Sequence, residues 1–158
     1  MRTTYLIALG SNRRHHAFGR PRDVVLAAIG ELSAIGRVTA QSSVISTDPI
    51  GPAQRRFANA ACLLENGDDP VDLLENLKGI ERRFGRRRGQ VWGDRVLDLD
   101  IVLWSGGIVE TRSLSIPHRE FRTRGFVLVP ASEIAPYWRD PKSGRTLRQL
   151  AARCSMAR

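Results

Sequence analysis

The sequence lacks long apolar runs and contains only two cysteines. It contains no run of about 18 apolar residues, and Gly10 and Asn12 interrupt its apolar start, which argues against a signal peptide. Its two cysteines, Cys62 and Cys154, lie far apart without metal-ligand spacing, so we interpret both as free thiols. We therefore expect a soluble, cytoplasmic protein with no membrane association.

Lysine is also scarce: the chain has only Lys78 and Lys142. Its net charge of +9 therefore comes almost entirely from arginine. Basic patches bind phosphate backbones, so an RNA-binding module is one hypothesis. Such a module would carry several exposed aromatic residues on its central strands in an extended Lys/Arg-Gly-Phe-type run. The sequence has Arg-Gly-Phe at 124–126, but no further aromatic residue continues this run. Most arginines are scattered along the chain. Only the arginine cluster at residues 82–88, close to a pair of aspartates, indicates a specific functional role.

The 158 residues, 42% of them hydrophobic, predict one compact domain over residues 1–158. Hydrophobic periodicity predicts these elements in chain order: a strand at 4–9, a helix at 21–36, strands at 38–47 and 57–64, a helix at 70–85 and a strand from 97. This order is typical of an α+β, ferredoxin-like sandwich with a mainly antiparallel sheet, helices packed on one face, and long functional loops.

Some finer expectations concern single segments. The helix after Pro70 is predicted to turn Val71, Leu74, Leu77 and either Ile80 or Phe84 inward. His15 and His16 are interpreted as solvated loop residues. After residue 105, the pattern predicts short extended pieces at 108–109 and 114–116, a break at Pro130, one helical turn at 131–135 and a last short helix from about 146.

Two carboxylates stand two residues apart in an alternating apolar run. Leu97, Leu99 and Ile101 alternate with Asp98 and Asp100, as in a half-buried strand. Residues i and i+2 of a strand point the same way, so the carboxylates are predicted to lie side by side, about 6 to 7 Å apart. Mg²⁺ binds one or two carboxylates together with substrate phosphates, and arginines suit phosphates too. The alternative is a pair that only solvates an exposed strand face.

A set of motifs surrounds this pair. In order they are ALGSN at 8–12, T-x-P-x-G at 47–51 with Q-x-x-F-x-N at 54–59, IE at 80–81 with GRxR at 85–88, WGxRxLDxDI at 92–101, and PH at 117–118 with RGFVL at 124–128. Together they resemble the 6-hydroxymethyl-7,8-dihydropterin pyrophosphokinases of folate biosynthesis. The resemblance implies an enzyme that transfers the pyrophosphoryl group of ATP to the pterin hydroxymethyl group and leaves AMP, with two Mg²⁺ ions.

The same resemblance implies roles for single residues. Asp98 and Asp100 would hold the metal ions, and Arg86 and Arg95 would clamp the moving phosphates, so these four are the candidate catalytic residues. The implied ATP-binding residues are Glu81, Arg88, Trp92, His118 and Arg124. The implied pterin-binding residues are Thr47, Asp48, Ile50, Asn59 and the aromatic pair Phe57 and Phe126. We expect a monomer whose partners are these two small substrates, with no nucleic acid.

The chain departs from the family pattern at a few positions. Asp94 stands where the family usually has proline, beside the phosphate-binding arginines. Arg119 stands where the family commonly has proline or an aromatic residue, and Ile45 stands where it commonly has tyrosine. A catalytically weakened relative that binds pterin or ATP is therefore the main alternative. Segments 48–56 and 86–95 are polar and contain Gly or Pro, and we predict that both move during the reaction.

Overall fold

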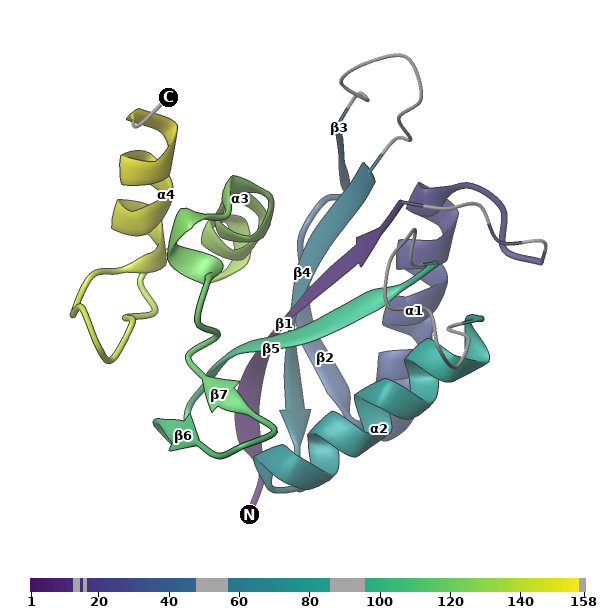
Figure 1. The fold of residues 1–158 in the computed structure, drawn as a ribbon, viewed down its shortest axis with the longest axis horizontal. Helices are drawn as coiled ribbons and strands as arrows, with labels where there is room; N and C mark the ends of the chain where they lie inside the picture. The colour runs from purple at the N-terminus through teal and green to yellow at the C-terminus, as the bar shows by residue number, and fades with distance from the viewer. Residues whose placement is uncertain (13–14, 16, 48–56, 86–95, 157–158) are drawn as a thin grey trace.

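The fold is built on one antiparallel sheet (Figure 1). The computed structural model describes residues 1–12, 15, 17–47, 57–85 and 96–156. The sheet has the order β2-β4-β1-β5, and β3 pairs with β4. Its strands are β1 (Thr3–Ser11), β2 (Arg37–Gln41), β3 (Ile45–Thr47), β4 (Phe57–Asn66) and β5 (Asp98–Trp104). Counting β2 and β3 as one broken strand, this is the ferredoxin-like order that the sequence predicts.

Side-chain alternation divides the core into two layers. Along β1, Tyr5, Ile7 and Leu9 lie in the larger buried cluster, together with apolar residues of α1 (Pro21–Ile35) and α2 (Pro70–Arg83). Leu6 and Ala8 lie in a second cluster on the opposite face. Because β1 is central and contributes to both clusters, it is buried on both faces, which explains its continuous apolar run.

The start of α2 shows how local signals set a helix. Asp69 accepts a hydrogen bond from the backbone N–H of Asp72, and Pro70 occupies the first turn. Pro70 is itself buried, and this fixes the helical phase so that Leu73 points into the core. The prediction that Val71 points inward is therefore wrong, since its side chain is exposed. Leu77 and Ile80 are buried as predicted.

Helices cover part of the second face as well, in contrast to the expectation that all helices pack on one face. These helices are η1 (Phe121–Thr123), α3 (Gly125–Ile134) and α4 (Leu147–Met156). Figure 1 shows α3 and α4 across the sheet from α1 and α2. The predicted break at Pro130 is wrong, because α3 continues through it. Burial of Val127, Leu128 and Ala131 against the sheet favours the helix over the proline penalty of about 3 kcal/mol.

The segment before α1 corrects one further expectation. His15 is buried rather than solvated, whereas His16 lies outside the described residues. The Nδ1 atom of His15 accepts hydrogen bonds from the backbone N–H groups of Ala17 and Phe18, at 2.9 and 3.2 Å. Its ring packs against Phe18 and Phe84. The tight turn therefore folds the imidazole back onto the end of α2.

The last strands form a small hairpin beside β5. β6 (Val109–Glu110) pairs with β7 (Ser115–Ile116), which confirms the predicted extended pieces. The backbone N–H of His118 donates to the carbonyl of Val102 at 3.0 Å, so the chain after the hairpin is attached to β5. Within the described ranges, no helix is long and apolar enough to cross a membrane.

Candidate active site

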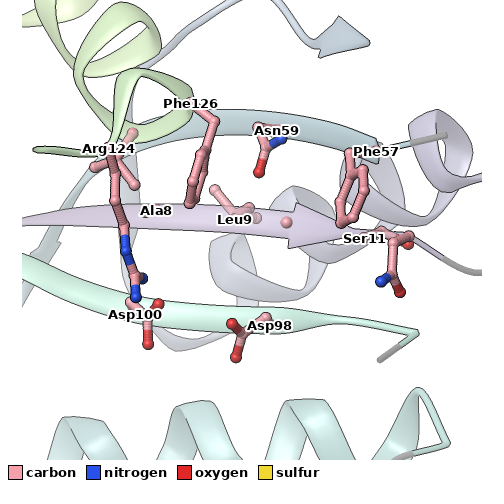
Figure 2. Close-up of a pocket in the computed structure, with 12 residues that line it drawn as sticks. Ala8, Leu9, Ser11, Phe57, Asn59, Asp98, Asp100, Arg124 and Phe126 are labelled. Carbon is pink, nitrogen blue, oxygen red and sulfur yellow. The ribbon is translucent and has the colours of Figure 1, made fainter. Parts of the chain in front are cut away.

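A cavity of about 590 Å³ lies on the second face of the sheet, beside α3 (Figure 2). It is lined by backbone and side chains of β1, the start of β4, β5 and the start of α3. The lining residues are Ala8, Leu9, Gly10, Ser11, Asn12, Phe57, Asn59, Asp98, Asp100, Arg124, Phe126 and Val127. Six residues with predicted roles thus line one hollow, although they come from three separate parts of the sequence.

The two carboxylates stand on the face that the alternation predicts. Leu99 lies in the larger apolar cluster, so Asp98 and Asp100 on either side of it are half-buried and open into the cavity. Their cross-strand partners on β1 are Gly10 and Ala8. Because these partners are small, they leave the space above the carboxylates empty. A Cβ added to Gly10 would stand 3.0 Å from the Oδ1 atom of Asn59, so a larger residue there would require the Asn59 side chain to shift by a few tenths of an ångström.

Two aromatic rings flank the cavity. Phe57 and Phe126 are 44% and 45% exposed, although both are large apolar side chains. Figure 2 shows the two rings facing the same hollow, with Asn59 between them. Exposed aromatic residues that gather at one cavity indicate a binding site for a flat apolar ligand with a polar edge, and Asn59 supplies both a donor and an acceptor for that edge.

A second cavity of about 450 Å³ opens at the outer edge of β5. Its lining residues are Leu74, Leu99, Asp100, Ile101, Arg112, Ser113, Leu114, Ser115, His118, Arg119, Glu120 and Arg124. Asp100 and Arg124 line both cavities. The arrangement therefore offers two adjoining compartments that meet at a carboxylate and a guanidinium group.

His118 lies beside Asp100 in the second cavity, with 4.0 Å between Nε2 and a carboxylate oxygen. Its Nδ1 atom accepts a hydrogen bond from the backbone N–H of Glu120, so the neutral ring carries its proton on Nε2, facing Asp100. Burial lowers the pKa of His118 below its usual range, and the Arg124 guanidinium lowers it further, against the opposing charges of Glu120 and Asp98. The imidazole is thus held neutral near pH 7.

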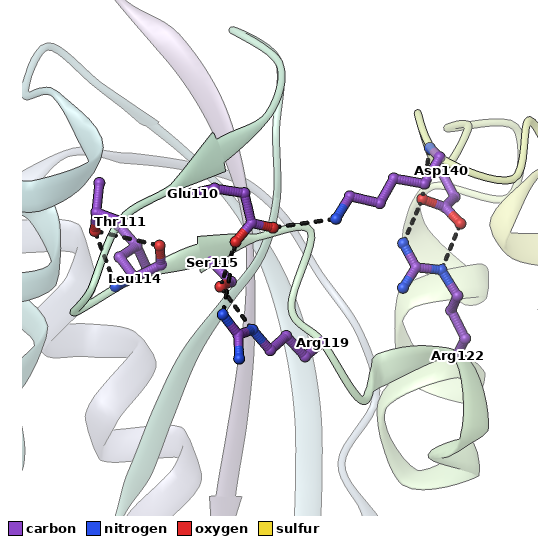
Figure 3. Close-up of polar contacts among 8 residues, drawn as sticks. Glu110, Thr111, Leu114, Ser115, Arg119, Arg122 and Asp140 are labelled. Carbon is purple, nitrogen blue, oxygen red and sulfur yellow. Dashed lines mark hydrogen bonds and ion pairs between the residues drawn. The ribbon is translucent and has the colours of Figure 1, made fainter.

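Arg124 donates a hydrogen bond to the carboxylate of Glu120, and the 3₁₀ turn between these residues is held by a second ion pair. Arg122 in η1 donates two hydrogen bonds to Asp140, at 2.6 and 2.8 Å, and Asp140 is fully buried (Figure 3). Burial favours a raised pKa for Asp140, but hydrogen bonds from Arg122, Ser143 and the backbone N–H of Lys142 outweigh it and hold the pKa well below its usual range. This pair attaches η1 to the turn before α4.

Further contacts join the second cavity to the C-terminal turn. Glu110 of β6 accepts from Lys142 at 3.1 Å and from Ser115 at 3.0 Å, and Arg119 donates to Ser115 at 2.9 Å. Figure 3 shows Glu110, Ser115 and Arg119 side by side at the hairpin. The partly exposed Glu110 has a pKa below its usual range, chiefly because of the Lys142 and Ser115 hydrogen bonds. Arg119 is therefore tethered at the rim of the cavity.

Glu81 lies outside the linings of both cavities. It is buried in α2, and its carboxylate accepts a hydrogen bond of 2.8 Å from the backbone N–H of Leu99. Thr47 lies in β3 opposite Phe57 of β4. The other predicted site residues lie outside the described residues; they are Asp48, Ile50, Arg86, Arg88, Trp92 and Arg95. Asp94 and the segments predicted to move also fall there.

Sequence reasoning missed part of the second cavity. Arg112 and Ser113, in the turn between β6 and β7, line it without any predicted role. The signal for them was weak: a polar tight connection that precedes the Pro117-His118 motif. Leu74 and Ile101 were interpreted only as apolar positions of a helix and a strand.

The chemistry of the carboxylate pair suits a hard divalent cation. Asp98 and Asp100 present oxygen ligands on one face, with Gly10 and Ala8 leaving room above them. Within the part of the chain that the structure describes, no group of three or more His, Cys, Asp or Glu side chains gathers around a point. Two protein carboxylates plus phosphate and water oxygens are a ligand set that Mg²⁺ accepts.

Comparison with known proteins identifies the family. A sequence profile described as 7,8-dihydro-6-hydroxymethylpterin-pyrophosphokinase (HPPK) matches residues 6–136. The chain belongs to the HPPK family. A Synechocystis HPPK, named 2-amino-4-hydroxy-6-hydroxymethyldihydropteridine pyrophosphokinase, is 38% identical over 147 residues, which cover 92% of this chain and 73% of the relative. A Pseudomonas aeruginosa HPPK of the same name is 39% identical over 151 residues, with coverages of 94% and 90%.

Solved HPPK structures share the fold. A crystal structure of Plasmodium falciparum HPPK-DHPS with pteroate superposes with a TM-score of 0.73 at 14% identity, over 97% of this chain. This chain spans 42% of that longer chain. At such low identity the likeness shows the fold alone. The predicted family and the predicted ferredoxin-like, mainly antiparallel fold are both confirmed.

The first prediction concerns the Arg122–Asp140 pair. Replacing Asp140 by Asn should lower the free energy of unfolding by about 3 kcal/mol, because Arg122 is left without its charged partner. The Asp140 contribution is fully present above its unfolded pKa of about 3.9 and is lost as the pH falls towards the lower folded pKa. Urea unfolding at several pH values should therefore show the difference between wild type and variant shrinking below about pH 4.

A matched control for this measurement is the exposed pair between Arg83 and Glu31, 3.6 Å apart. Replacing Glu31 by Gln should change the free energy of unfolding by about 0.5 kcal/mol or less. Equal effects of the Asp140 and Glu31 substitutions would contradict the anchoring role.

The second prediction concerns His118. In the metal-free protein its imidazole should titrate below the usual pKa of about 6.5, as followed by NMR of the ring C–H signals. Replacing Arg124 by Met removes the neighbouring positive charge and should raise the His118 pKa. A wild-type pKa above the usual value, or a fall in the variant, would contradict the geometry described here.

Proposed function

We propose that the protein transfers the pyrophosphoryl group of ATP to the hydroxymethyl group of 6-hydroxymethyl-7,8-dihydropterin and releases AMP. Membership of the HPPK family and relatives that carry this enzyme name over most of their length support this activity. The observation that supports it most directly is the pair of adjoining cavities that share Asp100 and Arg124. Two substrates bound side by side would meet where those residues stand.

The first cavity suits the pterin. Phe57 and Phe126 would bind the two faces of the flat ring by offset stacking. Asn59 would hydrogen-bond its polar edge, together with Thr47 and the backbone around Asp48 and Ile50. The hydroxymethyl group would then point towards Asp98 and Asp100 on β5, which line the same cavity.

The second cavity suits ATP. Its wall carries three arginines and His118, which favour phosphate and ribose oxygens, and Leu74 and Ile101 offer an apolar surface for the base. Arg124 would hold the phosphates at the boundary with the pterin site. Arg88 and Trp92 are proposed as further ATP-binding residues, and Arg86 and Arg95 as the catalytic arginines.

The chemistry requires one bond to form and one to break. The hydroxymethyl oxygen attacks the β-phosphorus, the bond from that phosphorus to the bridging oxygen of the α-phosphate breaks, and the hydroxyl proton is released. Bound Mg²⁺ would neutralise phosphate charge and lower the pKa of the attacking hydroxyl. Asp98 and Asp100 would hold it, and the arginines would stabilise the negative charge that moves onto AMP.

We infer two Mg²⁺ ions, a monomer that acts as one pyrophosphokinase domain over residues 1–158, a cytoplasmic location and no nucleic-acid partner. The two-carboxylate platform supports the metal requirement, because Asp98 and Asp100 would hold the ions and supply carboxylate oxygen ligands.

The third prediction tests the reaction itself. Purified protein with ATP, Mg²⁺ and the hydroxymethyl dihydropterin should produce AMP and not ADP, as separated by ion-exchange chromatography. Replacing Asp98 or Asp100 by Ala should lower the rate at least about a hundredfold. The control is Asp72→Ala, which removes an exposed carboxylate of α2 and should leave the rate unchanged. Production of ADP, or full activity in both site variants, contradicts the proposal; a low wild-type rate would favour the weakened relative.

The fourth prediction tests the aromatic pair. Phe57→Ala and Phe126→Ala should each raise the KM for the pterin about tenfold, which corresponds to about 1.4 kcal/mol of lost stacking and apolar contact. In Phe57→Ala the KM for ATP should stay within about twofold, because this ring lines only the first cavity, whereas the Phe126 ring also packs against Arg124. Tyr137→Ala is the control, since this ring is exposed and lines neither cavity. An unchanged pterin KM in both phenylalanine variants would contradict the stacking role.

A further inference from the structure

Glu81 is the one predicted ATP-binding residue in the described chain that the structure buries away from both cavities. Its residue exposure is 3%, and it lies in the last turns of α2 among apolar neighbours such as Leu77 and Ile80. Burying a carboxyl group costs several kcal/mol unless it is hydrogen-bonded. A buried glutamate therefore needs a structural or catalytic reason.

That reason lies on β5. Within the described residues, β1 is the only strand that pairs with β5, so the outer edge of β5 has no strand to accept its N–H groups. The N–H of Leu99 is directed to that edge, and Glu81 accepts it at 2.8 Å. An unpaired backbone N–H at this buried position would cost about 1 to 3 kcal/mol. Glu81 thus supplies the acceptor that a neighbouring strand would otherwise provide.

The hydrogen bond from Leu99 to Glu81 restrains the backbone between the two aspartates. Leu99 lies between Asp98 and Asp100, and its side chain is buried in the core below them. Its peptide groups connect directly to both aspartates, so fixing the N–H of Leu99 fixes the backbone from which both carboxylates project. Phosphate-bound cations require such ligands within a few tenths of an ångström, and outer partners of metal ligands supply that order.

We propose that Glu81 is a positioning residue for the Asp98–Asp100 pair and acts through the backbone N–H of Leu99 rather than by touching ATP. The inference rests on the proposed function for its catalytic consequence, but the hydrogen bond itself does not. It differs from the role that family resemblance implies for this position. If Glu81 contacted ATP directly, its negative charge or both carboxylate oxygens would be needed at the nucleotide. A positioning role needs only one oxygen of residue 81 that accepts from the N–H of Leu99.

Two substitutions separate these roles. Glu81→Gln keeps an oxygen that accepts from Leu99 but removes the charge, whereas Glu81→Met fills a similar volume without an acceptor. Glu75→Met is the matched control, because Glu75 is exposed on the same helix. Amide hydrogen exchange of Leu99, measured by NMR without any ligand, reports the bond directly. Calorimetric titration of Mg²⁺ in the presence of a non-hydrolysable ATP analogue reports metal affinity.

If Glu81 positions the pair, Glu81→Met should speed Leu99 exchange and weaken Mg²⁺ binding about 10- to 100-fold, with the ATP KM at saturating Mg²⁺ unchanged. Glu81→Gln should stay close to wild type in both readouts, and protection at Leu73 should persist in all variants as evidence of folding. The proposal is overturned if Glu81→Gln is as damaging as Glu81→Met and raises the ATP KM, or if Leu99 exchange and Mg²⁺ affinity do not change in Glu81→Met.

These readouts also separate this inference from the proposed function. Failure of the wild type to produce AMP would refute the reaction. Loss of Leu99 protection together with weaker Mg²⁺ binding in Glu81→Met would still support the positioning role.

Discussion

The alternation of side chains along β5 is the constraint on which the site depends. Leu99 and Ile101 are buried beneath α1 and α2, so Asp98 and Asp100 must face the opposite side of the sheet. A slip of one residue would bury both carboxylates and expose both apolar side chains, at a cost of several kcal/mol for each charge. The apolar core therefore orients the polar site, and the carboxylates need no contact with each other to be parallel.

The alternation along β5 can be predicted from sequence because it is a local pattern. Most of the other strands and helices can be predicted from local patterns as well. The strands and helices up to Trp104 follow from periodicity and from signals such as Asp69 before Pro70. The failures share a cause, which is that tertiary packing outweighed a local preference. Pro130 suggests an interruption, yet α3 continues because Val127 and Ala131 bury against the sheet. Burial of Pro70 likewise set the phase of α2.

The site was only partly predictable for a different reason. Family resemblance supplied residue types, and strand alternation supplied the orientation of Asp98 and Asp100. The shared boundary of the two cavities depends instead on where the chain returns after the β6–β7 hairpin, when the N–H of His118 bonds to Val102. Hydrophobic periodicity does not predict that the chain after the hairpin bonds back to β5. The burial of Glu81 behind β5 was equally hidden, because a glutamate next to an arginine cluster looks like a surface residue in sequence.

The two sides of this boundary are held by different means. On the sheet side, β5 is fixed by its pairing with β1 and by the Glu81 carboxylate at its open edge. On the other side, Arg124 follows a single 3₁₀ turn, and its guanidinium donates a hydrogen bond to the carboxylate of Glu120 at the start of that turn. The Arg122–Asp140 pair adds a second restraint, because it ties that turn to the chain before α4. The C-terminal segment thus contributes to the site without lining it, because it fixes the direction from which Arg124 reaches Asp100.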